Sequence, residues 1–323
     1  MTIYQQGALG DEVRRLQQEL QARGFYRGPL DGHFGGGTAV AVRAFQRQAG
    51  LVADGVVGPR TWGALFSGAE PPVPAVLHQP LAHRCLALTG AFETSAPPPE
   101  CFCGLSGDFD EQGISFGALQ WCLGQKSLQP LLEQMDRQHP DVVGEIFDEF
   151  SDELRAVLAS DFDEQMNWAR SIQDQRRRVA EPWRGMLKTL GRRAEFQAIQ
   201  VAAADDLFQQ ALGLCRSYGL RSQRAVALLF DIKVQNGGIK QHVEAQIRQD
   251  FRALGRRGEA DETPRLVIIA ERRAAAANPR WVNDVRQRKL AIATGRGLVH
   301  GQRYHLEAQY GIGLQAADTL ANS

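Results

Sequence analysis

Apolar residues recur at intervals of three and four along most of this 323-residue chain, which is the spacing of amphipathic helices. The first 66 residues hold three short segments of this kind, separated by glycine-rich turns. Asp11 is placed to cap the first segment and Gly24 to end it, while Thr38 precedes the second and Gly50 ends it. Their apolar positions are Val13, Leu16 and Leu20, then Val42 and Phe45, then Trp62 and Leu65. The pattern predicts a small three-helix unit.

A different pattern begins after this unit. Residues 67–80, SGAEPPVPAVLHQP, are rich in Pro and Ala without periodicity, which predicts a semi-stiff linker. From Leu81 onward helical spacing dominates, and only residues 113–123 have the composition of strands. We therefore expect a mainly α protein of the α+β class with one small sheet, divided into domains at 1–68 and 81–323 with a linker at 69–80. Helices are expected at 81–92, 127–138, 142–150, 152–158, 162–179, 183–190, 193–218, 222–236, 239–254, 264–277 and 281–294.

The charge balance argues against one broad class of partner. Lys plus Arg and Asp plus Glu each number 37, so the chain has no general attraction for nucleic acid or for an anionic membrane. No apolar run approaches the roughly 20 residues that cross a bilayer, and the N-terminal residues lack the basic-then-apolar order of a signal peptide. We expect a protein without a membrane span, delivered by another system if its target lies outside the cytoplasm.

Five cysteines leave at least one thiol unpaired within a monomer. Cys101 and Cys103 either bridge to Cys122 or are reduced thiols in the core, and the sequence leaves both alternatives open. The C-x-C spacing does not match a zinc pattern, so we expect no metal site and no cofactor.

Two turns in the first domain repeat each other about 23 residues apart. LDGHFG at 30–35 and ADGVVG at 53–58 each place an Asp-Gly turn before an apolar residue and a glycine. The order LQQEL..RGFY.GPLDGHFG..T..AVRAFQRQAGL..DGVVGPRTWGAL resembles the three-helix peptidoglycan-binding domain that many cell-wall hydrolases carry. The resemblance implies retention on the wall, with Asp31, Gly32, Asp54 and Trp62 as candidate neighbours of the binding groove.

Residues 92–117, FETSAPPPECFCGLSGDFDEQGISFG, hold the candidate chemistry. Breaking an acetal takes one protonated carboxyl and one ionised carboxylate. Glu93 ends an apolar helical run, so we expect its carboxyl to be partly desolvated, with the raised pKa that a general acid needs. Asp110 lies among Gly and polar residues and should stay ionised as a general base. Taken alone, each is more simply a helix-end or turn residue, and nothing local separates Asp108 from Asp110.

The combination is more specific than either acid. F-E-T-S, followed seventeen positions after the Glu by D-E-Q-G-I-S-F-G, resembles the F-E-N-S and D-G-R-G-Y-T-F-G motifs of the chitosanase family within the lysozyme superfamily. The resemblance implies a lysozyme-like helical fold with Glu93 as general acid and Asp110 as general base. Ser115, in place of the family's Thr, would hold the attacking water. If a water fits between the two carboxyl groups, their separation falls in the roughly 6.5–9.5 Å range of inverting enzymes.

Two later segments extend the resemblance. ALLFDIKVQNG at 227–237 resembles the family's buried helix, and RQRKLAIATGRGLVHGQRYHL at 286–306 resembles its closing helix and tail. Asp231 is expected to be a buried structural acid, while Arg286 and Arg288 lie either on a solvated helix face or behind the catalytic carboxylates. PPPECFC and ALQWCLGQ have no counterpart in the family, and no acids for glucosamine amines are identifiable, which weakens the case for chitosan.

Joined to a wall-binding domain, this frame predicts a muramidase-type peptidoglycan hydrolase, a bacteriolytic glycosidase cutting between N-acetylmuramic acid and N-acetylglucosamine. Asp108, Gln120 and Trp121 are expected on the substrate side, with Trp121 either stacking a sugar or lying in the core. A chitosanase, a lytic transglycosylase with one catalytic Glu and a non-catalytic wall-binding protein are the alternatives. We expect a monomer, made in the cytoplasm, that reaches the periplasmic wall through a holin, as a phage endolysin, or through a secretion machine, as an effector.

Overall fold

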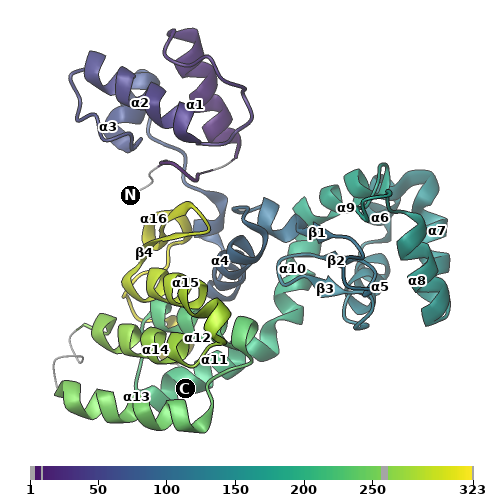
Figure 1. The fold of residues 1–323 in the computed structure, drawn as a ribbon. Coiled ribbons are helices and arrows are strands. Elements are labelled where there is room, and N and C mark those ends of the chain that lie inside the picture. The colour runs from purple at the N-terminus through teal and green to yellow at the C-terminus, as the bar shows by residue number, and fades with distance from the viewer. Residues whose placement is uncertain (1–3, 9, 256–260, 322–323) are drawn as a thin grey trace. The chain divides into compact units, whose positions relative to one another are not determined.

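The computed structural model describes residues 4–8, 10–255 and 261–321. Over these residues the chain is mainly helical, which confirms the predicted class, but it has two small antiparallel sheets where one was expected (Figure 1). The chain forms two compact units, Met1–Cys85 with Gln209–Ser323, and Leu86–Phe208. It passes between them within α4 (Leu81–Thr94) and α11 (Asp205–Tyr218), so neither crossing falls in the segment 69–80 predicted as a linker. None of the described helices is long and apolar enough to cross a membrane.

The first 66 residues fold as the predicted three helices, α1 (Asp11–Ala22), α2 (Gly36–Gln48) and α3 (Pro59–Leu65). Asp11 is the first residue of α1 and does not cap it, and Thr38, expected before the second helix, lies inside α2, so both expected helix starts are wrong. The stripes predicted from periodicity form one core, whose wholly buried side chains include Val13, Leu16, Leu20, Val42, Val57 and Trp62. A core this small gives a domain only marginal stability. The turns between the helices therefore need hydrogen bonds from buried side chains as further support.

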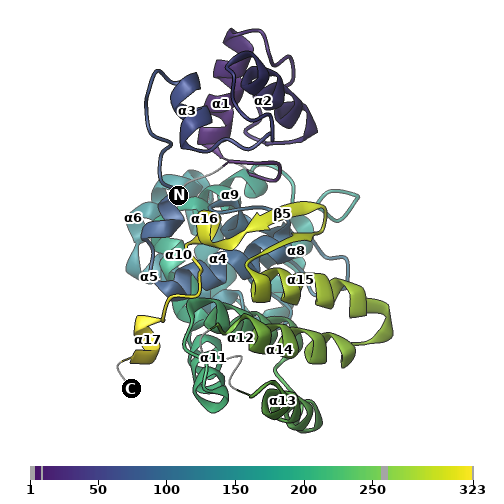
Figure 2. The same ribbon diagram turned by 90° about the vertical axis from the view of Figure 1, so that its left-hand side faces the viewer.

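The described residues of 209–255 and 261–321 form helices and one hairpin of paired strands. The helices after α11 are α12 (Gln223–Asn236), α13 (Gln241–Leu254), α14 (Thr263–Ala275), α15 (Val282–Thr294), α16 (Leu306–Tyr310) and α17 (Asp318–Ala321). Strands β4 (Arg296–Val299) and β5 (Gln302–His305) pair antiparallel in a hairpin that the sequence analysis missed. Its two turn residues, His300 and Gly301, have φ of 49° and 78°, as tight hairpins require. The hairpin follows α15 and packs on it (Figure 2).

A buried carboxylate ties α12 to α15. Asp231 accepts hydrogen bonds from the guanidinium of Arg288, the shortest at 2.7 Å, and from the ammonium of Lys289. All three side chains are buried. Burial alone would raise the pKa of Asp231, but the two neighbouring cations and their hydrogen bonds hold it below its usual range. Asp231 is therefore the structural acid that was expected, and Arg288 is not on a solvated face.

Residues 86–208 combine helices with a three-stranded sheet. The strands are β1 (Leu105–Ser106), β2 (Ser115–Phe116) and β3 (Trp121–Cys122), in the order β1-β2-β3. The helices are α5 (Gln129–Gln138), α6 (Pro140–Phe147), α7 (Ser151–Ala159), α8 (Phe162–Ser171), α9 (Trp183–Arg192) and α10 (Ala194–Ala203). One apolar core joins the sheet to these helices, with Ile114 and Phe116 on the sheet side. The expected helix at 162–179 stops at Ser171, and the one at 193–218 breaks at Ala204.

Gln200 on α10 fastens two loops of this unit. Its side chain is wholly buried, its Oε1 accepts from the backbone N–H of Ala118 at 2.9 Å, and its Nε2 donates to the carbonyl of Phe102 at 3.1 Å. The sheet has only two residues per strand, so few of its backbone groups are paired within it. A buried amide side chain supplies a donor and an acceptor that the short strands lack.

Removing the charge of Asp231 should destabilise the protein strongly. Asp231→Asn leaves Arg288 and Lys289 buried without their carboxylate, and breaking a buried ion pair costs about 3–5 kcal/mol. Urea denaturation followed by circular dichroism measures this loss. Asp250→Asn is the matched control because its pair with Arg272 is partly exposed, and it should change the unfolding free energy far less. Since the folded pKa of Asp231 is lowered, its contribution is present above about pH 4 and is lost as the pH falls further.

Replacing Gln200 by Met should destabilise the unit containing residues 86–208. Met has a similar shape but neither hydrogen-bonding group, so the buried N–H of Ala118 loses its acceptor and Phe102 O loses this donor. An unsatisfied buried group costs about 1–3 kcal/mol, and we expect a loss of about 2 kcal/mol by denaturant titration. Gln197→Met on the same helix removes bonds that are partly exposed and should cost little. Equal losses in the two variants would contradict the role of Gln200.

Candidate active site

Ser115 lies on the central strand of the small sheet. On β2 it is paired with Ser106 on one side and Cys122 on the other. Its neighbour Phe116 is buried and stacks on Phe196, with ring centroids 5.4 Å apart. Because side chains alternate along a strand, the half-buried Ser115 faces away from this core. Its hydroxyl is thus on the side of the sheet opposite Phe116.

Glu93 lies in the last turn of α4, and this end of the helix packs closely on the loops of the sheet. A Cβ on Gly90 would lie 2.8 Å from the Cβ of Ala118, and a Cβ on Gly104 would overlap the side chain of Thr94. Two glycines therefore allow the helix end and the sheet to approach. Glu93 is itself exposed, so the expected partial desolvation is wrong: the buried positions of α4 end one residue earlier.

Asp110 lies in the loop between β1 and β2. It is exposed, as expected for a base that stays ionised, and its Oδ1 is 3.4 Å from the backbone nitrogen of Gln112. The helix end, the loop and the strand that carry Glu93, Asp110 and Ser115 all belong to the unit of residues 86–208. Their catalytic roles stay predictions.

Asp108 closes the loop that carries Asp110. Its side chain is buried, with Oδ1 accepting from the backbone N–H of Gly113 at 2.8 Å and Oδ2 from Nε of Arg170 at 3.1 Å. Both carboxylate oxygens are thus used within the protein. Asp108 therefore closes the loop, because the loop's two ends meet on this carboxylate, and its role towards the substrate stays a prediction.

A second segment, at residues 172–180, holds the same loop from outside. Gln173 accepts from the backbone N–H of Asp108 at 2.8 Å, and Nη1 of Arg177 donates to the carbonyl of Asp108 at 3.0 Å. Gly107 lies so close that a Cβ there would overlap the carbonyl oxygen of Arg177. The sequence analysis missed these partners because it placed the segment inside a helix. The bridge between Gln173 and Val179 makes it a hairpin.

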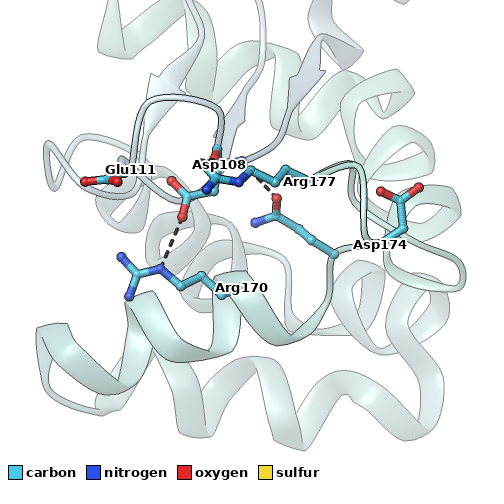
Figure 3. A pocket seen from close by; sticks show the side chains of 6 residues that line it. Asp108, Glu111, Arg170, Asp174 and Arg177 are labelled. Atoms are coloured by element: carbon cyan, nitrogen blue, oxygen red, sulfur yellow. Dashed lines mark hydrogen bonds and ion pairs between the residues drawn. The ribbon is translucent and has the colours of Figure 1, made fainter.

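Between the loop and the hairpin is a pocket of about 440 Å³ (Figure 3). It is lined by Asp108, Glu111, Arg170, Gln173, Asp174 and Arg177. In Figure 3 the side chain of Arg177 extends towards Asp108. Arg170, on α8, approaches the carboxylate of Asp108. Charged and amide groups line this pocket, as they line many sites that bind polar ligands.

The two other predicted substrate-side residues are engaged within the protein. Gln120 accepts from the hydroxyl of Ser106 at 2.8 Å and donates to the carbonyl of Gly117 at 2.9 Å. Trp121 is half-buried and packs against the core of the unit. Trp121 thus packs on the core with part of its side chain accessible, and Gln120 supports the turn before β3, while their roles towards the substrate stay predictions.

All five cysteines are free and buried, so the alternative of a bridge to Cys122 is wrong. Burial raises the pKa of Cys103 to about 12 and that of Cys101 well above its usual value. Gly191 of α9 packs on this segment, where a Cβ would lie 2.9 Å from Sγ of Cys103. The thiols beside the site are packing residues. Over the part of the chain that the structure describes, no three His, Cys, Asp or Glu side chains gather to hold a metal ion.

The predicted wall-binding residues belong to a repeated turn. Gln17 donates to Asp31 Oδ1 and accepts from the N–H of Gly32, both at 2.9 Å. Gln46 makes the same two bonds, at 2.9 Å each, to Asp54 and to the backbone of the glycine that follows it. The sequence analysis missed Gln17 and Gln46. Extending the repeat of the two turns back into the helix before each turn would have identified both residues.

These contacts decide what the four candidate groove residues can offer to a ligand. Asp31 and Asp54 are exposed, while Gly32 is buried. Trp62 has no exposed surface and packs on Tyr4 and Phe66. It is a core residue and does not line a groove, so naming it among the groove's neighbours was wrong.

Known proteins match the first domain closely. Residues 10–65 match the family model described as "Putative peptidoglycan binding domain". The N-acetylmuramoyl-L-alanine amidase CwlM of Mycobacterium tuberculosis is 50% identical over 68 residues, 20% of this chain and 17% of the relative. The spore cortex-lytic enzyme of Bacillus subtilis is 52% identical over 60 residues, 18% of this chain and 20% of the relative. The chain thus spans about a fifth of the length of these curated relatives.

Solved structures of chitosanases resemble a larger part of the chain more loosely. The Gynuella sunshinyii GH46 chitosanase in complex with chitotetraose has a TM-score of 0.43 and 15% identity, covering 73% of this chain and 99% of that one. The native chitosanase of Bacillus subtilis MY002 has a TM-score of 0.41 and 19% identity, covering 68% of this chain and 88% of that one. Residues 10–65 form a domain of the peptidoglycan-binding type.

Proposed function

We propose that this protein is a peptidoglycan hydrolase of the muramidase type, in which the first domain holds the wall and residues 86–208 carry the cutting site. One observation supports this above the others: a peptidoglycan-binding domain at residues 10–65 shares its chain with a unit that presents a carboxyl, a carboxylate and a hydroxyl from adjoining elements. Those groups are Glu93, Asp110 and Ser115. The bond cut is the one between N-acetylmuramic acid and N-acetylglucosamine.

The proposed mechanism inverts the anomeric carbon in one step. Glu93, protonated, gives its proton to the oxygen that leaves, while Asp110 takes a proton from the attacking water. Ser115 holds that water by a hydrogen bond. A glycan bound over the exposed Glu93 excludes water from the reacting groups. No cofactor takes part in these steps.

The place of action follows from the proposed substrate. Peptidoglycan lies outside the cytoplasmic membrane, so we place the activity at the wall, in the periplasm. Release through a holin or a secretion machine is part of the proposal, as is action by a monomer.

The peptidoglycan-binding domain at residues 10–65 favours peptidoglycan over chitosan as the substrate. The lytic transglycosylase is separated from the hydrolase by its product, since it closes an anhydro ring and adds no water.

Glu93→Gln should abolish lysis while leaving wall binding intact. The amide cannot donate the catalytic proton, and losing general acid catalysis lowers the rate by about 10²–10⁴-fold. Release of soluble fragments from purified sacculi measures the rate, and co-sedimentation measures binding. Glu100→Gln is the matched control, since Glu100 lies in the same loop region and pairs with Arg192 at the surface. Lysis by Glu93→Gln at the wild-type rate would exclude this role.

Asp110→Asn separates the hydrolase from the transglycosylase. An inverting hydrolase needs this base and should lose activity about 10²–10⁴-fold, whereas a single-Glu transglycosylase should keep most of it. Mass spectrometry of wild-type products is the second measurement. Muropeptides with a reducing end support hydrolysis. Muropeptides one water lighter, together with an Asp110→Asn variant that stays active, would show transglycosylation.

A further inference from the structure

The hairpin at residues 172–180 holds its arginines in a fixed position. Oδ1 of Asp174 accepts from the backbone N–H groups of Arg176 and Arg178 at 2.8 and 3.0 Å, and Oδ2 accepts from the guanidinium of Arg178 at 2.9 Å. These bonds, the backbone N–H of Arg178 foremost, lower the pKa of Asp174. Arg177, at the turn, has a φ of 55°, which a non-glycine residue rarely adopts. The turn thus presents Arg177 to the pocket (Figure 3).

The pocket carries charges of both signs, with Asp108, Glu111 and Asp174 lining it together with Arg170 and Arg177. Asp108 is neutralised by Arg170, and Asp174 by Arg178. Arg177 donates one N–H to a backbone carbonyl, and among the described residues no carboxylate pairs with it. Arg170 uses only Nε on Asp108 in this network. Several guanidinium N–H groups therefore face the pocket with hydrogen bonds still to donate.

We propose that this pocket binds a carboxylate on the muramic acid side chain of the glycan, with Arg177 as its principal contact and Arg170 beside it. The inference rests on the proposed function and names the feature of the substrate that the site reads. Guanidinium groups bind carboxylates through charge-assisted, often paired hydrogen bonds. Glu111, on the pocket's edge, accepts from amide N–H groups of the same substituent.

The position of the pocket fits a subsite next to the cut bond. Asp108, on its wall, precedes the proposed base Asp110 by two residues on one tightly closed loop. Muramic acid carries a lactyl group, which is a free carboxylate in peptide-free strands and is joined to a carboxylate-bearing peptide in the intact wall. A volume of about 440 Å³ accommodates either. Strands made only of N-acetylglucosamine have no such group.

Binding to soluble sugars tests the proposal independently of catalysis. The full chain with Glu93→Gln is titrated calorimetrically with three probes: the N-acetylglucosaminyl-N-acetylmuramyl peptide, the same disaccharide without peptide, and chitobiose with both amines acetylated. Adding Arg177→Gln should weaken binding of a carboxylate-bearing probe about tenfold and change chitobiose binding less than about twofold. The probe that is weakened identifies the source of the carboxylate.

Arg176→Gln is the matched control, because it removes the same charge one residue away and does not line the pocket. It should leave all three affinities unchanged. Equal weakening of all probes by Arg177→Gln would show a purely structural role for its bond to Asp108, and no weakening would also overturn the proposal. Failure of the wild-type protein to release fragments from sacculi would refute the proposed function, whereas the binding measurement would still decide the pocket.

Discussion

Backbone groups that secondary structure leaves unpaired are the constraint on which the rest of this structure depends. A buried N–H or carbonyl must find a partner, and the protein repeatedly meets this need with glutamine. Gln17 and Gln46 close the two turns of the first domain, and Gln173 and Gln200 fasten the loops around the small sheet. An amide suits this task because it donates and accepts without bringing a charge into the interior.

Hydrogen bonds from glutamine side chains to the backbone explain how a sheet with two-residue strands supports a candidate active site. The loop with Asp110 is closed by Asp108, held by Gln173 and Arg177, and anchored through strands whose other loops depend on Gln200. The carboxylate of Asp110 is thereby carried on an ordered loop, although the sheet has few hydrogen bonds between its strands. The same loop forms part of the pocket, so the arginines that support the loop also line the pocket.

Periodicity predicted most helices, because a buried stripe at intervals of three and four specifies a helix locally. It was wrong where local chemistry prevailed: the helix expected at 162–179 ends at Ser171, and beyond it Asp174 bonds to its own following backbone in a turn. The β4–β5 hairpin escaped notice because its strands are short and its turn begins with His300. Motif spacing predicts Glu93, Asp110 and Ser115 as catalytic residues, but Arg170 and Arg177, which line the neighbouring pocket, lie more than 50 residues further along the chain. Only tertiary contacts reveal such partners.

The five buried thiols have a consequence for the surroundings in which the protein works. The thiolate is the form that reacts with disulfides and oxidants, and burial raises the pKa values of Cys85, Cys101, Cys103 and Cys215, which disfavours that form. None of the five takes part in a disulfide bond. The fold therefore does not depend on oxidation, and its buried thiols are poorly accessible to oxidants. The same native state is therefore available on the reducing and on the oxidising side of a membrane.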